Sequence, residues 1–149
     1  MPAPPPSLRA RALKALARRE HSRQELQAKL QPFAEDPEEI GPLLDDLEKR
    51  GWLSEARFVE QLTTVRRRRF GAARILHELR EKGVSGAALV QAQSQLKDSE
   101  VEAARAVWKK KFGSLPTTLE ERAKQSRFLA SRGFSAEAVH AVLKKSCED

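Results

Sequence analysis

The chain has 149 residues, of which 40% are hydrophobic, so it is long enough for a modest core and too apolar for wholesale disorder. Tyrosine is absent, and alanine, leucine, glutamate, lysine, arginine and glutamine dominate, which predicts an all-α fold. The net charge is +7, and residues 51–97 carry most of it, with nine basic and four acidic side chains. Such an excess indicates a polyanionic partner or an acidic protein surface, although it also serves solubility.

The single cysteine, Cys147, excludes an internal disulfide, and a free thiol fits a reducing cytosol. The first six residues are rich in proline and lack the apolar segment of a secretory signal. No run of the sequence approaches the length of a membrane span. We therefore expect a cytoplasmic protein with no membrane partner.

After a flexible proline-rich tail over residues 1–6, the first three helices are expected near residues 7–20, 23–31 and 37–50. Ser22 and Glu25 have the spacing of a capping box for the second of them, and Asp36 and Glu39 have it for the third. Pro42 lies about a turn and a half into the third helix, so it either kinks this helix or moves its start to a later residue.

Six further helices follow. They are expected near residues 55–70, 72–82, 86–97, 100–112, 118–132 and 136–146. Ser99 and Glu102 have the spacing of a third capping box, at the start of the helix near 100–112.

A junction between helices recurs three times, with a basic residue, a glycine, a hydrophobic segment and a serine in that order. Its glycines and serines are Gly51 and Ser54, Gly83 and Ser85, and Gly133 and Ser135. The basic residue complements the helix dipole, glycine supplies the left-handed residue that ends a helix, and serine caps the next helix. Hydrophobic pairs recur with a period near 50 residues, which indicates stacked helical repeats.

We therefore predict three tandem three-helix repeats that resemble helix-turn-helix units. Repeat 1 spans residues 7–51, repeat 2 spans 52–97 and repeat 3 spans 98–146, before a tail at 147–149. Because each repeat is too small to bury its hydrophobic residues alone, we expect the repeats to stack into an elongated array, either straight or curved.

No pattern of the sequence supports an enzyme, a metal site or a cofactor. His21, His77 and His140 are scattered without ligand spacing. No glycine-rich phosphate loop is present. The adjacent acids Asp45 and Asp46 point about 100° apart on a helix, which suits a solvated face.

Two basic runs are candidate contact surfaces, and both are followed by Phe-Gly. They comprise Arg66, Arg67, Arg68 and Arg69 in repeat 2, and Lys109, Lys110 and Lys111 in repeat 3. Val65 is expected on the buried face of its helix. Arg67 and Arg68 are then expected to face outward, and Arg66 and Arg69 to flank the buried face. Arg74 could join them. One or two basic residues suffice to complement the dipole of a helix end. Four basic residues exceed this need, so they indicate a surface that binds phosphates or acidic side chains.

The first helix carries a looser basic set, in which Arg11 and Arg18 are candidate contacts. A DNA-binding helix-turn-helix protein would place its basic side chains on the second helix of the motif. Residues 86–93 carry no positive charge, and residues 37–50 are rich in acids. Sequence-specific reading of DNA is therefore not expected, while direct binding of nucleic acid stays a second hypothesis.

Taken together, these segments resemble the RecX family over residues 7–145. The resemblance is carried by Leu16-Ala17-Arg18-Arg19-Glu20-His21-Ser22-Arg23-Gln24-Glu25-Leu26, by Gly51-Trp52-Leu53 with Arg57-Phe58, by Gly71 to Val84, and by Arg127-Phe128-Leu129 with Arg132-Gly133-Phe134. Ser54 stands where the family usually has aspartate, and Val59 where it has a small alanine.

The resemblance implies a regulator that docks into the groove of the RecA–DNA filament and bridges neighbouring protomers. We expect it to be a monomer, with single- or double-stranded DNA as a weak or accessory partner. Proteins of this family inhibit filament growth, ATP hydrolysis, strand exchange and co-protease activity. It leaves open which filament state is recognised and which basic cluster dominates. We expect charge reversal at Arg67 and Arg68 to weaken filament binding while helicity stays intact.

Overall fold

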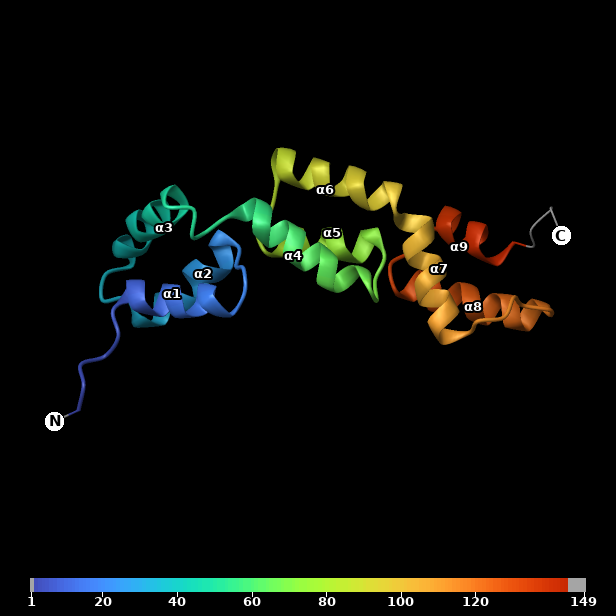
Figure 1. The fold of residues 1–149 in the computed structure, drawn as a ribbon, viewed down its shortest axis with the longest axis horizontal. Helices are drawn as coiled ribbons and strands as arrows, with labels where there is room; N and C mark the ends of the chain where they lie inside the picture. Colours follow the sequence, from blue (N-terminus) through green and yellow to red (C-terminus); the bar gives the residue numbers. More distant parts are fainter. Residues whose placement is uncertain (1, 145–149) are drawn as a thin grey trace. The chain divides into compact units, whose positions relative to one another are not determined.

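The computed structural model describes residues 2–144, and over this range it contains α-helices and two short 3-10 turns but no strand (Figure 1). The α-helices are α1 (Leu8–Arg18), α2 (Arg23–Leu30), α3 (Ile40–Lys49), α4 (Glu55–Arg67), α5 (Ala72–Glu81), α6 (Gly86–Asp98), α7 (Glu100–Lys111), α8 (Leu119–Ser131) and α9 (Ala136–Leu143). The predicted all-α fold is confirmed. Cys147, the tail at 147–149 and the end of the helix expected at 136–146 lie outside the described residues.

The chain forms two compact units. The first unit comprises the described part of residues 1–61 together with 81–84, and the second comprises 62–80 together with the described part of 85–149. None of the helices described between residues 2 and 144 is both long enough and apolar enough to cross a membrane.

The core of the first unit is formed by aliphatic residues of α1, α2 and α3, such as Ala12, Leu26 and Leu44, which are inaccessible to solvent. Residues 81–84 pack onto α2, where the Gln24 side-chain amide donates to the carbonyl of Glu81 at 2.9 Å. The unit therefore combines three consecutive helices with a short segment from later in the chain.

The start of α3 shows how the chain accommodates Pro42. A 3-10 turn occupies Pro37–Glu39, and the α-helix begins only at Ile40. Pro42 thus lies in the first turn, where its missing N–H has no partner to lose. Of the two expected outcomes, the later start is the one observed. Asp36 caps the 3-10 turn through the N–H of Glu38 instead of forming a capping box with Glu39.

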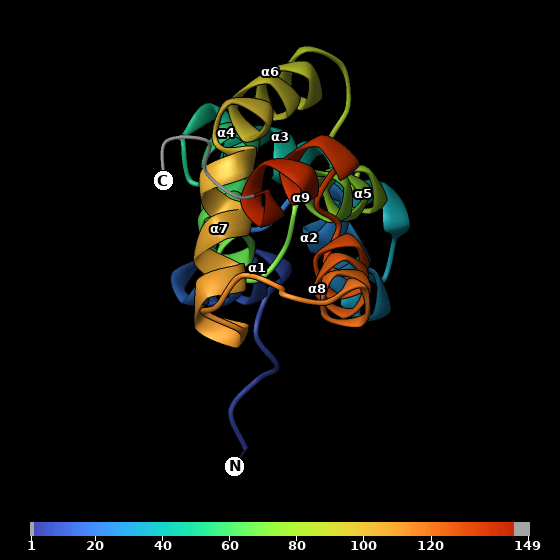
Figure 2. The ribbon, with the colours of Figure 1, turned by 90° about the vertical axis from the view of Figure 1, so that its right-hand side faces the viewer.

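The core of the second unit is built from α7, α8 and α9, which Figure 2 shows grouped together. Leu129 of α8, Ala138 of α9 and Ala104 of α7 are almost fully buried there. The Trp108 indole N–H donates to the side-chain oxygen of Gln125 at 2.8 Å, which satisfies a polar atom beside this core. Val65 of α4, which was expected on a buried line, is 53% exposed.

The recurring junctions end their helices as predicted. Gly51, Gly83 and Gly133 have φ angles of 77°, 92° and 91°, a left-handed conformation that favours glycine. At Gly133 the N–H of the glycine donates to Ala130 and that of Phe134 to Leu129, which is the Schellman arrangement.

The serines of the junctions differ in what they do. The hydroxyls of Ser54 and Ser135 accept from the N–H groups of residues 57 and 138, so both cap the next helix as expected. Ser85 makes no capping hydrogen bond through its side chain. Ser99 makes none either: its hydroxyl lies within hydrogen-bond distance of the carbonyls of Gln95 and Leu96 and accepts from the Arg67 guanidinium, so the box predicted with Glu102 is wrong.

Two turns of the second unit are in direct backbone contact. The N–H of Gly71, before α5, donates to the carbonyl of Arg132 at 2.7 Å, and the N–H of Ala73 donates to that of Gly133 at 3.3 Å. A Cβ on Gly71 would lie 2.3 Å from the carbonyl carbon of Gly133. The α4–α5 turn is therefore held against the α8–α9 turn at a distance that no larger residue allows.

Candidate functional site

The four consecutive arginines at the end of α4 do not act alike. Arg67 is only 14% exposed, and its guanidinium donates to the Glu100 carboxylate at 2.8 Å and to the carbonyl of Leu96 at 2.6 Å. The prediction that Arg67 faces outward is wrong, because this acidic partner lies 33 positions further along the chain and holds the side chain inward.

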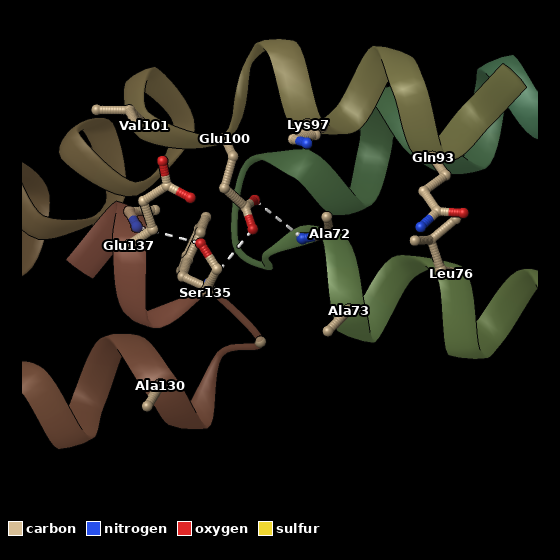
Figure 3. Close-up of a pocket in the computed structure, with 13 residues that line it drawn as sticks. Ala72, Ala73, Leu76, Gln93, Lys97, Glu100, Val101, Ala130, Ser135 and Glu137 are labelled. Carbon is tan, nitrogen blue, oxygen red and sulfur yellow. Dashed lines mark hydrogen bonds between the residues drawn. The ribbon is translucent and has the colours of Figure 1, made fainter. Parts of the chain in front are cut away.

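Glu100, the first residue of α7, is 8% exposed and accepts from three donors. Besides Arg67, the N–H of Ala72 donates to it at 3.0 Å and the N–H of Ser135 at 3.3 Å. Figure 3 shows the last two bonds as dashed lines. One carboxylate thus accepts from the starts of α5 and α9, where the helix dipole favours a negative charge.

A cleft of about 510 Å³ lies beside Glu100 (Figure 3). Its walls are mostly apolar, with Leu76, Val101 and Phe134 among them. Because Glu100 already accepts three hydrogen bonds, we assign this carboxylate to the architecture of the second unit and not to a ligand.

The other arginines of the run remain available to different degrees. Arg66 forms two hydrogen bonds with the Glu78 carboxylate, at 2.8 and 3.0 Å, and these bonds raise the pKa of its guanidinium. Arg68 and Arg69 are exposed, and no carboxylate of residues 2–144 forms an ion pair with them. Of the four, these two are the ones free to contact a partner.

The remaining candidate residues lie on exposed positions or against aromatic rings. Arg74 is exposed and its guanidinium carbon is 4.2 Å from the centre of the Phe70 ring. Lys109, Lys110 and Lys111 are exposed at the end of α7. In the first unit, Arg18 is exposed, and Arg11 stacks on the Phe33 ring at 3.6 Å.

Most other basic side chains of the first unit are held by acids. Arg23 pairs with both Asp45 and Glu48, and Arg57 pairs with Glu20. Asp46 pairs with both Arg9 and Arg50. Glu25 pairs with both Arg19 and Lys82. A cation that is already paired has little attraction left for a further anion, so the unpaired cations of the second unit are the stronger candidates.

Glu25 illustrates the pairing in the first unit and leads to a pH-dependent prediction. Burial opposes its charge, but hydrogen bonds from Arg19, from the N–H of Ser22 and from Lys82 together lower its pKa to about 2. The carboxylate therefore stabilises the first unit above its unfolded pKa of about 4.5, and this stabilisation is lost as the pH falls toward 2. We expect Glu25→Gln to lower the unfolding free energy by on the order of 2–3 kcal/mol at pH 7.

The measurement compares thermal unfolding of the wild type and Glu25→Gln, followed by circular dichroism, at neutral pH and near pH 2.5. The difference between them is expected to shrink at the lower pH. Glu35→Gln, at an exposed position, serves as the control and should match the wild type at neutral pH. A wild-type advantage that stays constant across this pH range would contradict the assignment.

One group that the sequence reasoning missed lies at the third junction. Arg132 was assigned only to the dipole of its helix, yet its guanidinium carbon is 5.7 Å from the Phe70 ring centre and 4.9 Å from that of Phe128. The only signal available was that both basic runs end in Phe-Gly. Within residues 2–144, no group of three or more histidine, cysteine or acidic side chains is placed to hold a metal ion.

Comparison with known proteins identifies the family that shares this architecture. Residues 54–92 match the second three-helix domain of RecX and residues 98–143 match the third. The regulatory protein RecX of Leptothrix cholodnii is 51% identical over 93% of this chain and 88% of its own, and that of Ralstonia nicotianae is 46% identical over 97% and 91%. The crystal structure of RecX from Lactobacillus salivarius aligns with a TM-score of 0.75 over 91% of both chains, at 17% identity. The tandem three-helix repeats are thereby confirmed, and the chain belongs to the RecX family of regulatory proteins.

Proposed function

We propose that this protein binds the RecA–DNA filament and inhibits its growth, ATP hydrolysis, strand exchange and co-protease activity. It would thereby modulate recombination, DNA repair and the SOS response. The observation that carries the proposal is the near full-length similarity to regulatory proteins named RecX, among them one that is 51% identical.

The distribution of basic side chains supports this proposal. Unpaired cations occur at several places of the second unit, at Arg68 and Arg69, around Arg74, and at Lys109–Lys111. We infer that repeats 52–97 and 98–146 present these cations to neighbouring RecA protomers, and that repeat 7–51 adds Arg11 and Arg18. Several weak contacts made at once then give high avidity.

The first experiment measures ATP hydrolysis by RecA on single-stranded DNA while this protein is added below and above stoichiometric amounts. We expect inhibition by the wild type and weaker inhibition by the double variant Arg68→Glu with Arg69→Glu. The control is Arg9→Gln, whose cation is already paired with Asp46. Hydrolysis that continues unchanged with excess wild-type protein would rule out the proposal.

This function requires binding and no catalysis, so we infer a non-enzymatic protein that needs no cofactor. We propose that it acts as a monomer in the cytoplasm, where filaments assemble on the chromosome. Light scattering of the purified protein checks the monomer, and a molar mass of about twice 16.7 kDa would contradict it.

A second candidate function is direct binding of DNA without RecA. It is favoured by one observation, the set of second-unit cations that no described carboxylate neutralises. Binding that depends steeply on salt concentration would support it, since each neutralised phosphate releases counterions.

A further inference from the structure

Three cations and two aromatic rings of the second unit alternate in a continuous row. Arg74 lies 4.2 Å from the ring centre of Phe70, and Arg132 lies 5.7 Å from that ring and 4.9 Å from the ring of Phe128. The ammonium of Lys111 follows, 5.5 Å from the Phe128 ring. We call these five residues the cation–aromatic row.

The cation–aromatic row contains residues from both of the basic segments that end in Phe-Gly. Phe70 ends the run of arginines, and Lys111 with Phe112 ends the run of lysines. Phe112 meets Phe128 edge to face, with ring centres 5.5 Å apart, and so supports the ring that carries Lys111 and Arg132. Two motifs that lie 42 positions apart in the chain therefore contribute to one set of contacts.

The backbone fixes the central part of this row. The N–H of Gly71, next to Phe70, donates to the carbonyl of Arg132 at 2.7 Å. Gly133 makes the Schellman turn that ends α8 directly after Arg132. The central guanidinium thus extends from a fixed main chain, and its contacts with two rings restrict the side chain beforehand, so less side-chain entropy is lost when an anion binds.

The charge of the row is not neutralised within the described chain. No carboxylate of residues 2–144 forms an ion pair with Arg74, Arg132 or Lys111. In the same unit, Arg66 and Arg67 are both paired, with Glu78 and Glu100. The row therefore keeps its attraction for an external anion.

The chemistry of these side chains indicates which class of anion the row binds. A guanidinium near the face of a ring keeps the N–H groups on its edge available, and these match two phosphate oxygens at once. The side chains of the row offer hydrogen-bond donors and rings but no acceptor. A phosphodiester chain carries a continuous series of such acceptors, which suits a row of donors that has no acceptor of its own.

We propose that the cation–aromatic row binds the phosphate backbone of DNA without reading the base sequence. The proposal rests on the direct DNA contact named above as the second candidate function. It does not require RecA, so its test leaves RecA out and fails or succeeds separately from filament inhibition.

The test measures binding of fluorescently labelled oligothymidylate, and of a duplex, to the full chain by anisotropy between 50 and 200 mM salt. The row variant combines Arg74→Gln, Lys111→Gln and Arg132→Gln. The matched control combines Lys14→Gln, Lys29→Gln and Lys49→Gln, which removes the same charge from exposed positions of the first unit.

For single strands, we expect the row variant to bind at least about tenfold more weakly than the wild type, with the logarithmic salt slope reduced by about 2, since each lost phosphate contact removes about 0.7. The control is expected to retain most of the affinity. Whether the oligothymidylate or the duplex loses more identifies the form of DNA that the row prefers.

Equal losses in both triple variants would show that net charge alone matters and would overturn the proposal. So would undiminished binding by the row variant, or no binding by the wild type. A row variant that binds DNA normally but no longer inhibits RecA would assign the row to an acidic protein surface instead. Circular dichroism checks folding, and Lys111→Gln alone, with an expected slope change of about 0.7, is the test if the triple variant does not fold.

Discussion

Replacing Glu100 with alanine is expected to lower the unfolding free energy of the second unit by about 3–5 kcal/mol. The substitution leaves the guanidinium of Arg67 buried without its acidic partner. It also removes the acceptor for the N–H groups of Ala72 and Ser135. A buried charge that loses its partner is among the most destabilising changes a small domain can undergo.

The chain allows this loss to be measured in the second unit alone. Its two tryptophans are Trp52, in the first unit, and Trp108, in the second. In a Trp52→Phe background, denaturant unfolding followed by fluorescence reports the surroundings of Trp108. Arg68→Ala is the control, and because Arg68 is exposed and unpaired we expect a change within about 0.5 kcal/mol. Equal stabilities for the two variants would refute the role of Glu100.

Gly71→Ala is the second change with a large expected effect, a destabilisation of about 3 kcal/mol at the upper end of the range for overpacking. The new methyl group would lie 2.3 Å from the backbone of Gly133. Relief of this overlap requires the two turns to separate, which breaks the hydrogen bond from Gly71 to Arg132.

Gly41→Ala provides the comparison, because a Cβ at this helical position would meet no atom within 4 Å. There we expect stabilisation by about 0.5–1 kcal/mol, since alanine restricts the unfolded chain more than glycine does. Thermal unfolding followed by circular dichroism is the measurement. If both glycine variants unfolded at the same temperature, the close approach of the two turns would not be a determinant of stability.

The helical repeats were predictable because their signals are local. A glycine that must be left-handed, such as Gly51 or Gly133, ends a helix through bonds to residues a few positions away. The capping box of Ser22 and Glu25 is confirmed in both of its hydrogen bonds for the same reason. The capping box predicted for Ser99 is wrong because a hydroxyl at a helix boundary can bond either to the next helix or to the preceding one. Here it bonds to the preceding helix.

The functional surface was predictable only in part. Helical geometry places Arg67 and Arg68 on neighbouring faces, but it does not show which face meets an acid from elsewhere in the chain. Glu100 is that acid, and its position depends on how α7 packs. For this reason the double charge reversal at Arg67 and Arg68 would combine a folding defect with a binding defect, and the exposed pair Arg68 and Arg69 is the better probe.

The cation–aromatic row could not be predicted from the sequence, for a related reason. Its members come from the α4–α5 turn, α5, α7 and α8, and the pattern of none of these segments points to another. Repetition of Phe-Gly after each basic run showed that the two segments are alike. It did not show that they meet.

Glu100 also links motions at distant places in the chain. Its carboxylate accepts from Ala72 and from Ser135, which open α5 and α9 and lie 63 positions apart. A fluctuation that swings this side chain outward uncovers both amide hydrogens together, so the two helix starts share one opening event and exchange with solvent in a correlated way.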